Sequence, residues 1–284
     1  MWDIIGRAPV HMRAGSDVPG RITRLPGGVA MNIAMTLARF GMRPAVLSAI
    51  GRDSQGEDLI RAAEGLGVEC RHAYRSEDLP TDRYMAIEGA NGLIAAVADA
   101  HSLEAAGAKI LRALSDGSLG TDSAPWDGPI ALDGNLTTAL LSEISRAPAF
   151  AKADLRVAPA SPGKAERLGV LMQHPRATLY VNLEEAGILC QSEFADAASA
   201  AEGLIARGAR RVLVTDGGKN AADGAADGVI FAAPPPVLVT RVTGAGDTFM
   251  AAHIVAETRG ETREEALSRA LTAAARYVSG DIST

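Results

Sequence analysis

The sequence predicts an α/β protein with a mostly parallel sheet and helices on both of its faces. Short runs rich in β-branched and other apolar residues are typical of buried strands, at residues 45–50, 130–133, 155–158, 178–182 and 211–215. Segments with helical spacing and helix-forming residues occur among them, at residues 28–40, 56–65, 137–147, 195–206 and 248–257. Strands that alternate with helices in this way indicate βαβ units, whose parallel strands are covered by helices.

Two segments break this alternation and predict a small antiparallel flap at the edge of the sheet. Residues 4–25 contain strand-like pieces and many turn residues, without helical spacing. Residues 83–98 are expected to form a hairpin around the glycine-containing turn at 88–92. Because no linker rich in Gly, Ser and Pro divides the chain, we expect one domain over residues 1–284, with a lid from parts of 4–25 and 83–99.

Two further segments are interpreted from their glycines and prolines. Residues 216–228 are glycine-rich and predict a surface turn between two strands. Residues 229–239 are apolar but contain three consecutive prolines at 234–236, which indicates a strand followed by a rigid connection.

The composition is that of an ordinary globular protein with a surplus of acidic residues. Of its 284 residues 47% are hydrophobic and 22% are charged, and the formal net charge is −6. The absence of a basic stripe argues against a nucleic-acid partner. Cys70 and Cys190 lack metal-ligand spacing and are expected to be buried thiols in a reducing compartment. No secretory signal is present, and no uncharged apolar run reaches the roughly 18 residues of a membrane span, so we expect a cytoplasmic protein without a membrane partner.

Polar or small residues follow four of the predicted strands. They are Gly134 and Asn135, Ala160 and Ser161, residues 183–185, and residues 216–218. Ligands collect at the carboxyl ends of the strands in doubly wound sheets, so four such ends together favour a binding crevice. Any one of them alone is explained equally well by the residue types that end strands.

The strongest local signal is the segment VTGAGDTF at residues 242–249, directly before a helical run. Gly244, Ala245 and Gly246 are small enough for the loop amides to turn inward, and a helix N-terminus adds partial positive charge. This combination predicts an anion hole suited to the charge that develops on a phosphoryl group. Asp247, at the mouth of that hole, has the chemistry of a base for an attacking hydroxyl; the alternative is a helix N-cap.

Other common phosphate motifs are absent. Lys164 and Lys219 each lack the upstream glycine of a Walker-type loop, and residues 244–249 lack the third glycine of a dinucleotide fingerprint. Walker-type ATPases and Rossmann dehydrogenases are therefore disfavoured.

A second signal lies in the segment LPGGVAMNIA at residues 25–34, where Gly27 and Gly28 open a helix and Asn32 lies one turn later. The glycines would let a polyhydroxylated ligand approach the backbone, and an amide can both donate to and accept from sugar hydroxyls. The alternative is a glycine turn before an amphipathic helix.

Together these motifs resemble the ribokinase/PfkB family of carbohydrate and nucleoside kinases. The likeness extends over nearly the whole chain, with GGVAMNIAMTLARFG at 27–41, GRD at 51–53, NLEE at 182–185, TDG at 215–217 and TGAGD at 243–247. The resemblance implies a three-layer α/β/α ribokinase-like core with a mostly parallel sheet and a small β lid. It also implies ATP with Mg²⁺ as the donor, a sugar or nucleoside as the acceptor, and room for a monovalent cation. Lids in this family often pair across a homodimer, and the alternative is that the apolar face of the lid packs on the chain's own core.

The residues expected in the site match the family's motifs one by one. The resemblance implies a catalytic group of Asp247 as the base, with Gly244, Ala245 and Gly246 as the anion hole. It implies a sugar-binding group of Gly27, Gly28 and Asn32. It implies a nucleotide-binding group of Thr215, Gly217, Asn182 and Lys164, and Glu185 as the residue that organises Mg²⁺ through water.

One departure concerns the carboxylate with which the family grips two ribose hydroxyls at the exit of the first strand. In the segment IGRAPVHMRAG at residues 5–15, that place is expected to be held by His11, or by the nearby Asp17 if the loop folds inward. A neutral imidazole offers one acceptor where a carboxylate offers several. The alternative is that His11 is a surface histidine.

Three details are similar to the pseudouridine kinases within the family. Arg241 stands where an Asp usually precedes the TGAGD motif, residues 158–164 resemble a Pro-Val-Ser-x-x-Lys motif, and residues 84–99 resemble the lid hairpin. The expected reaction is ATP-dependent phosphorylation of a primary 5′-hydroxyl, with pseudouridine as the acceptor and pseudouridine 5′-phosphate as the product. The alternatives are another acceptor of the same family, such as ribose, another nucleoside or 2-keto-3-deoxygluconate, and a non-catalytic nucleoside-binding sensor.

Overall fold

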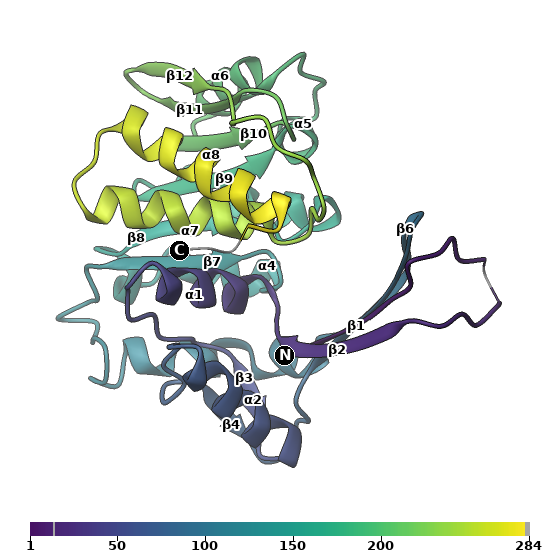
Figure 1. Ribbon diagram of the computed structural model, residues 1–284. Coiled ribbons are helices and arrows are strands. Elements are labelled where there is room, and N and C mark those ends of the chain that lie inside the picture. Colours follow the sequence, from purple (N-terminus) through teal and green to yellow (C-terminus); the bar gives the residue numbers. More distant parts are fainter. Residues whose placement is uncertain (14, 282–284) are drawn as a thin grey trace. The chain divides into compact units, whose positions relative to one another are not determined.

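The computed structural model describes residues 1–13 and 15–281. These residues divide into two compact units, and each has its own sheet (Figure 1). The first unit comprises Met1–Met35 and Arg43–Ile110, and the second comprises Thr36–Met42 and Leu111–Thr284. The helix α1 (Val29–Arg39) begins in the first unit, and its last residues belong to the second.

The second unit is built on a six-stranded sheet in the order β12-β11-β10-β9-β8-β7. Four neighbouring strands are parallel, namely β7 (Pro129–Asp133), β8 (Asp154–Ala158), β9 (Ala177–Asn182) and β10 (Arg211–Thr215). Two antiparallel strands complete the sheet, β11 (Ala221–Ala225) and β12 (Gly228–Ala232). The predicted α/β class with a mostly parallel sheet is therefore confirmed.

Helices cover both faces of this sheet, as β11 shows. Successive side chains of a strand point to opposite faces. Asp223 forms hydrogen bonds with Arg263 of α8 (Arg263–Ser279), whereas a Cβ at Gly224 would lie within 3.0 Å of Ala201 of α6 (Ala197–Ala206). The two helices thus pack on opposite sides of β11.

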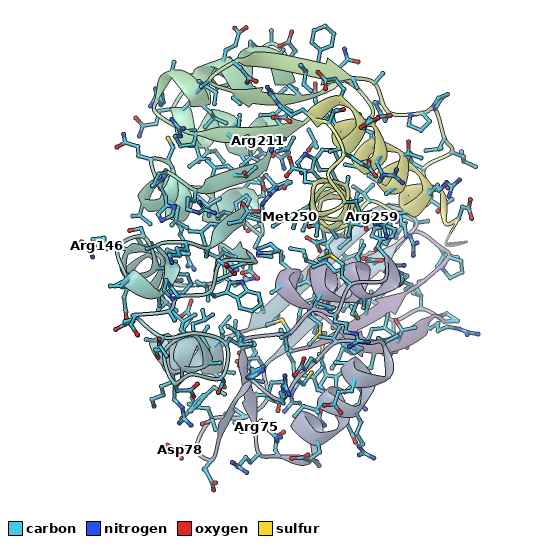
Figure 2. All side chains as sticks on the ribbon, turned by 90° about the vertical axis from the view of Figure 1, so that its left-hand side faces the viewer. Arg75, Asp78, Arg146, Arg211, Met250 and Arg259 are labelled. Carbon is cyan, nitrogen blue, oxygen red and sulfur yellow. The ribbon has the colours of Figure 1, made fainter. Side chains whose placement is uncertain are left out.

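The helix α7 (Ala245–Thr258) lies beside α8 in the same layer (Figure 1). Every residue from 248 to 256 is buried, as expected of a helix whose side chains are packed on all sides. Figure 2 labels Met250 on this helix, Arg259 as the C-cap directly after it, and Arg211 on the strand β10. The remaining helical segments of the unit are α4 (Thr138–Ile144), α5 (Leu183–Cys190) and the 3₁₀ turns η2 (Pro148–Phe150) and η3 (Pro162–Leu171).

The first unit contains the flap as a four-stranded sheet in the order β2-β1-β5-β6. Its strands are β1 (Trp2–Arg7), β2 (Arg21–Pro26), β5 (Arg83–Gly89) and β6 (Gly92–Asp99). The predicted hairpin at 83–98 is present. The sheet is mixed rather than antiparallel, because β1 and β5 belong to separate hairpins and pair in parallel.

The rest of the first unit packs around short strands and helices. The elements are β3 (Ala49–Gly51), α2 (Ser54–Gly65), β4 (Tyr74–Ser76), α3 (His101–Ala106) and the 3₁₀ helix η1 (Gly107–Leu114), whose last residues belong to the second unit. The predicted strand at 45–50 is shorter than expected, since only its end pairs with β4. Trp2, Ile50 and Leu59 form part of a buried cluster in this unit.

The glycine-rich segment at 216–228 is not simply a surface turn, so that prediction is wrong. It contains the buried strand β11, and the Asp223 side chain is completely buried. Asp223 is an ion-pair partner of Arg211 and Arg263, which makes its burial tolerable. Small residues allow this strand to lie close under α6, whereas their composition alone suggests a turn.

Two further observations concern expectations from composition. Cys70 and Cys190 are buried and are not disulfide-bonded. Within residues 1–13 and 15–281, no helix combines the length and the hydrophobicity that a bilayer crossing requires.

Candidate active site

The predicted anion-binding segment lies at the start of α7. The helix begins at Ala245, earlier than the predicted run, and its N-cap Gly244 is in the left-handed conformation with φ of 89°. A Cβ at Gly244 would also approach the Tyr277 hydroxyl to 2.5 Å, so the position requires glycine on both counts. Ala245, Gly246 and Asp247 therefore form the first turn, where backbone N–H groups lack acceptors within the helix.

Asp247 occupies the third position of α7 and is half-buried. The helix N-cap is Gly244 and carries no side-chain cap, so Asp247 is not the N-cap. Its carboxylate lies in the turn where the helix concentrates its partial positive charge, which favours a negative group. A carboxylate and an electropositive turn are thus adjacent in one short segment.

The four parallel strands end at a common edge. The register aligns Asp133 of β7 with Ala158 of β8, and Thr215 of β10 with Asn182 of β9. The polar residues that follow these strands therefore gather along one edge of the sheet, as the sequence predicts.

Asn182 and Glu185 form a capping box at the start of α5. The Asn182 side chain accepts a hydrogen bond of 2.9 Å from Glu185 N, and the Glu185 carboxylate accepts one of 2.8 Å from Asn182 N. Glu185 is only 7% exposed, and burial raises the pKa of its carboxyl group. The capping box holds this carboxylate at the carboxyl end of β9, where a nearby cation would favour its charged form.

Lys164 contacts a residue at the end of another strand. It lies in η3, and its Nζ donates to Asn135 Oδ1 over 2.5 Å. Asn135 N in turn donates to Asp133 Oδ1 over 2.7 Å, at the end of β7. The positive charge of Lys164 is held at the same edge of the sheet as Asn182 and Thr215, a position suited to an anion.

At the end of β10, Gly217 follows Thr215 with a φ of 55°. This left-handed conformation turns the chain directly after the strand. Asp216, between them, forms an ion pair of 3.0 Å with Lys219. Thr215 and Gly217 therefore lie at the carboxyl end of β10, and their contact with a nucleotide stays a prediction.

In the first unit, Gly27 and Gly28 lie directly against the carboxylate of Asp3. A Cβ at Gly27 would be 1.9 Å from Asp3 Cγ, and Gly28 N donates to Asp3 Oδ2 over 3.4 Å. Asn32 follows one turn into α1, where its N–H donates to Gly28 O. The predicted sugar-binding glycines are thus joined by an acidic residue that the motif does not contain.

The Asp3 carboxylate retains hydrogen-bonding capacity. Burial raises the pKa of its carboxyl group, and its Oδ1 is buried without a hydrogen-bond partner among the described residues. A buried carboxylate oxygen that lacks a donor is unfavourable, and a ligand hydroxyl would satisfy it.

His11 and Asp17 lie at the other end of the same hairpin. The register pairs Trp2 with Pro26 and Arg7 with Arg21, so the connection 8–20 is at the end remote from Gly27. Both side chains are exposed in that connection. The structure therefore places Asp3, and neither His11 nor Asp17, beside the glycines. The sequence predicts the carboxylate after the first strand. The pairing of Trp2 with Pro26 instead brings Asp3, near the start of that strand, beside the glycines.

Comparison with known proteins identifies this arrangement. Residues 1–280 match the family model described as pfkB family carbohydrate kinase. The chain belongs to this family. Its members are carbohydrate kinases, phosphotransferases that act on an alcohol group.

Solved structures of the family share the fold. A carbohydrate kinase from Agrobacterium tumefaciens is 26% identical and superposes with a TM-score of 0.82, covering 100% of this chain and 89% of that one. A ribokinase from Thermotoga maritima has the same fold, with a TM-score of 0.76 and 22% identity over 98% of this chain and 90% of the other. The ribokinase-like fold is therefore confirmed.

Sequence relatives cover shorter stretches. An uncharacterized sugar kinase of Escherichia coli, YeiI, is 33% identical over 140 residues, which are 49% of this chain and 37% of the relative. The pseudouridine kinase of E. coli is 36% identical over 66 residues, which are 23% of this chain and 21% of the relative. The matched stretches thus span less than two thirds of these curated relatives.

Proposed function

We propose that this chain transfers the γ-phosphoryl group of ATP to a primary hydroxyl of a sugar or nucleoside, with Asp247 as the base. The observation that carries the proposal is Asp247 in the first turn of α7, directly after the left-handed Gly244. The acceptor hydroxyl gives its proton to the Asp247 carboxylate as its oxygen bonds to the γ-phosphorus. The bond to the β-phosphate oxygen breaks, and ADP leaves.

In this proposal the turn formed by Gly244, Ala245 and Gly246 stabilises the transferring group. Ala245 N already donates to Val242 O over 3.0 Å, so the N–H groups that follow it in the first turn of α7, with the partial charge of the helix, would face the negative charge on the phosphoryl oxygens. Asp247 shares that turn, so proton acceptance and charge stabilisation are provided by one short segment.

The nucleotide would be bound by the residues at the carboxyl ends of the parallel strands. Thr215, Gly217 and Asn182 would border ATP, and the ammonium group of Lys164 would contact a phosphate. A ribokinase from Arabidopsis thaliana, which has the same fold with a TM-score of 0.74, has been solved with ribose and ATP. This supports ATP as the donor.

Glu185 fits a role at magnesium. Among residues 1–13 and 15–281 there is no group of three or more His, Cys, Asp or Glu side chains that could hold a metal. Magnesium that binds with a nucleotide needs only one or two carboxylates, because water and phosphate oxygens complete its coordination. The Glu185 carboxylate, fixed by the capping box, would hold Mg²⁺ through water, and the ion would neutralise phosphate charge.

The acceptor would be held by Asp3 together with Gly27, Gly28 and Asn32. A carboxylate can accept from two neighbouring hydroxyl groups, and the glycines leave room for the ligand against the backbone. We expect Asp3→Asn to raise KM for the acceptor about tenfold, the effect of about 1.4 kcal/mol for weakened hydrogen bonds to a charged group. His11→Ala and Asp17→Asn are matched controls, and a larger effect from either would contradict this assignment.

We propose pseudouridine as the first acceptor to test. The matched stretches of the pseudouridine kinases from E. coli and A. thaliana support it. The longer match to an uncharacterized sugar kinase keeps ribose and related sugars as the alternative.

The four-stranded sheet β2-β1-β5-β6, which contains the predicted lid, supports a homodimer. Ile22, Met85, Ile87 and Val97 lie on one face of it, because the register places them opposite Ile4, Gly6 or each other. All four are exposed, Ile22 to 79% and Val97 to 69%. Such an apolar face fits a second copy of the same sheet. Light scattering should therefore give a dimer that Val97→Lys converts to monomer, and a wild-type monomer would contradict the proposal.

The test of function is an assay of ATP consumption with Mg²⁺, in which mass spectrometry identifies each product. The acceptors are pseudouridine, uridine, cytidine, adenosine, ribose and 2-keto-3-deoxygluconate. Preference for pseudouridine over uridine supports the proposed acceptor, and preference for another compound keeps the reaction and rejects the acceptor. Binding without any phosphorylated product would reject the kinase proposal in favour of a sensor.

A further inference from the structure

The loop before the Gly244–Asp247 turn is hydrogen-bonded to the carboxyl end of α8 through Thr240 and Arg241. Thr240 N and Arg241 N both donate to Val278 O, over 2.8 and 3.2 Å. The Thr240 hydroxyl donates to the same carbonyl over 3.1 Å. Carbonyl groups in the last turn of a helix lack partners within the helix, so the loop satisfies acceptors that α8 leaves open.

Arg241 adds a positive charge to this helix end. Its Nε donates to Tyr277 O over 2.7 Å, and its guanidinium carbon lies 3.9 Å from the centre of the Tyr277 ring. A cation near helix carbonyls and above an aromatic face is stabilised by both. Arg241 Nη2 is buried without an acceptor among the described residues, so the Nε bond and the stack are the contacts that hold the group.

Tyr277 also reaches the turn itself. Its hydroxyl donates to Thr243 O over 2.9 Å, directly before the N-cap of α7. The same hydroxyl lies 2.5 Å from the position that a Cβ of Gly244 would occupy. Tyr277 therefore contacts Arg241 through its ring and backbone oxygen, and it contacts the turn through its hydroxyl.

We propose that Arg241 and Tyr277 are positioning residues, which hold the Gly244–Asp247 turn in the conformation used for phosphoryl transfer. The guanidinium acts as a built-in cation on the Tyr277 carbonyl near the end of α8. Main-chain oxygens of this kind are also ligands for potassium, so the side chain makes a separate monovalent cation at this place unnecessary. The proposal rests on the proposed kinase function for its activity readout and is independent of it for its structural readout.

The first experiment replaces Arg241 and attempts to restore the cation. We expect Arg241→Ala to lower kcat about 100-fold with little change in KM for the acceptor, because a displacement of about 1 Å in a catalytic group has that effect. Guanidinium chloride at a non-denaturing concentration should restore a substantial part of kcat by occupying the vacated place. Arg269→Ala is the matched control, since Arg269 lies on the same helix, is 53% exposed and pairs with Glu261. It should neither lose activity nor respond to guanidinium.

The second experiment measures the conformational stability of the Gly244–Asp247 turn and does not depend on catalytic activity. Amide hydrogen exchange of the peptide that covers residues 240–249 should be faster in Arg241→Ala than in the wild type, and guanidinium should slow it again. Tyr277→Phe keeps the stack and removes only the bond to Thr243 O, so it should give a smaller increase in exchange. This variant also serves if Arg241→Ala does not fold.

Faster exchange that guanidinium reverses supports the proposal even if no acceptor is phosphorylated, in which case the proposed function alone fails. If amide exchange at residues 240–249 is unchanged in both Arg241→Ala and Tyr277→Phe, the positioning role of Arg241 and Tyr277 is overturned. A loss of kcat in Arg241→Ala that guanidinium does not restore overturns it as well.

Discussion

The two ends of α7 are held by different kinds of contact. At its carboxyl end, Glu257 forms ion pairs with Arg156 and Arg211, and Arg211 continues to the fully buried Asp223. At its amino end, the turn before the helix rests on backbone hydrogen bonds and on the stacked pair Arg241 and Tyr277. Figure 2 shows Arg211 on the sheet, Met250 on α7, and Arg259 directly after the carboxyl end of α7.

This contrast separates stability from chemistry along one helix. Removing one partner of a buried ion network leaves an uncompensated charge, so the carboxyl end resists change. The amino end has few side-chain contacts and lies in an exposed connection, as expected of a segment that binds and releases a ligand. The carboxyl end of α7 is thus held rigidly, and the turn that contains Asp247 lies at the other end of the same helix.

The largest expected effect is at the amino end. Asp247→Asn removes the proposed proton acceptor while the helix start remains, so kcat should fall about 1,000-fold, within the range for loss of a general base. The melting temperature should change little. The measurement is kcat together with thermal unfolding, and a variant that retains most of the wild-type turnover would show that Asp247 is not the base.

At the carboxyl end we expect loss of stability rather than of chemistry. Glu257→Gln leaves Arg156 and Arg211 without their shared carboxylate, and the free energy of unfolding should fall by about 3 to 5 kcal/mol. Urea titration measures this loss, with the exposed Glu264→Gln on α8 as the control. If Glu257→Gln instead lowers kcat as strongly as Asp247→Asn at unchanged stability, the separation between the two ends is incorrect.

The pH dependence of stability sharpens the same comparison. His253 is fully buried one turn before Glu257, with Nδ1 2.9 Å from the Tyr180 hydroxyl, and burial lowers its pKa from 6.5 to about 4. The unfolded chain takes up a proton below pH 6.5, whereas the folded chain does so only near pH 4. Stability should therefore fall as the pH drops through this window, by about 3 kcal/mol in total.

His253→Gln should remove this part of the pH dependence. Urea titrations at several pH values between 6.5 and 4.5 measure it for both proteins. The pKa of the Glu257 carboxyl is also lowered, with burial opposed by His253 and the arginines, so its own contribution is lost at still lower pH. Identical pH profiles for the wild type and His253→Gln would exclude His253 as the titrating group.

The smallest expected effect is that of monovalent cations in the buffer on kcat, which concerns the amino end of α7. Since the Arg241 guanidinium already contacts the Tyr277 carbonyl near the end of α8, replacing potassium by tetramethylammonium should change the wild-type kcat by less than about twofold. A strict requirement for potassium would contradict the role of Arg241 as a built-in cation. Arg269→Ala, which leaves the loop intact, should behave as the wild type does.

Much of the fold follows from patterns within the sequence. The strands β7 to β10 and the helix α6 agree with the predicted runs to within a few residues, because period-2 and period-3.6 patterns are local. The capping box of Asn182 and Glu185 and the left-handed Gly244 likewise depend on residues close in sequence. The sequence by itself therefore determined the layered architecture, the family and the segment that carries Asp247.

Tertiary structure decided which distant residues meet. Asp3 reaches Gly27 because the hairpin register pairs Trp2 with Pro26, and no local pattern specifies that register. Asp223 becomes a buried ion-pair partner because β11 lies between the strands β10 and β12, with one helix on each face. Its segment nevertheless has the composition of a turn. The pairing of Arg241 with Tyr277 likewise depends on how the end of α8 packs. Such contacts are set by burial and packing over long sequence separations, where the periodicity of a single segment carries no information.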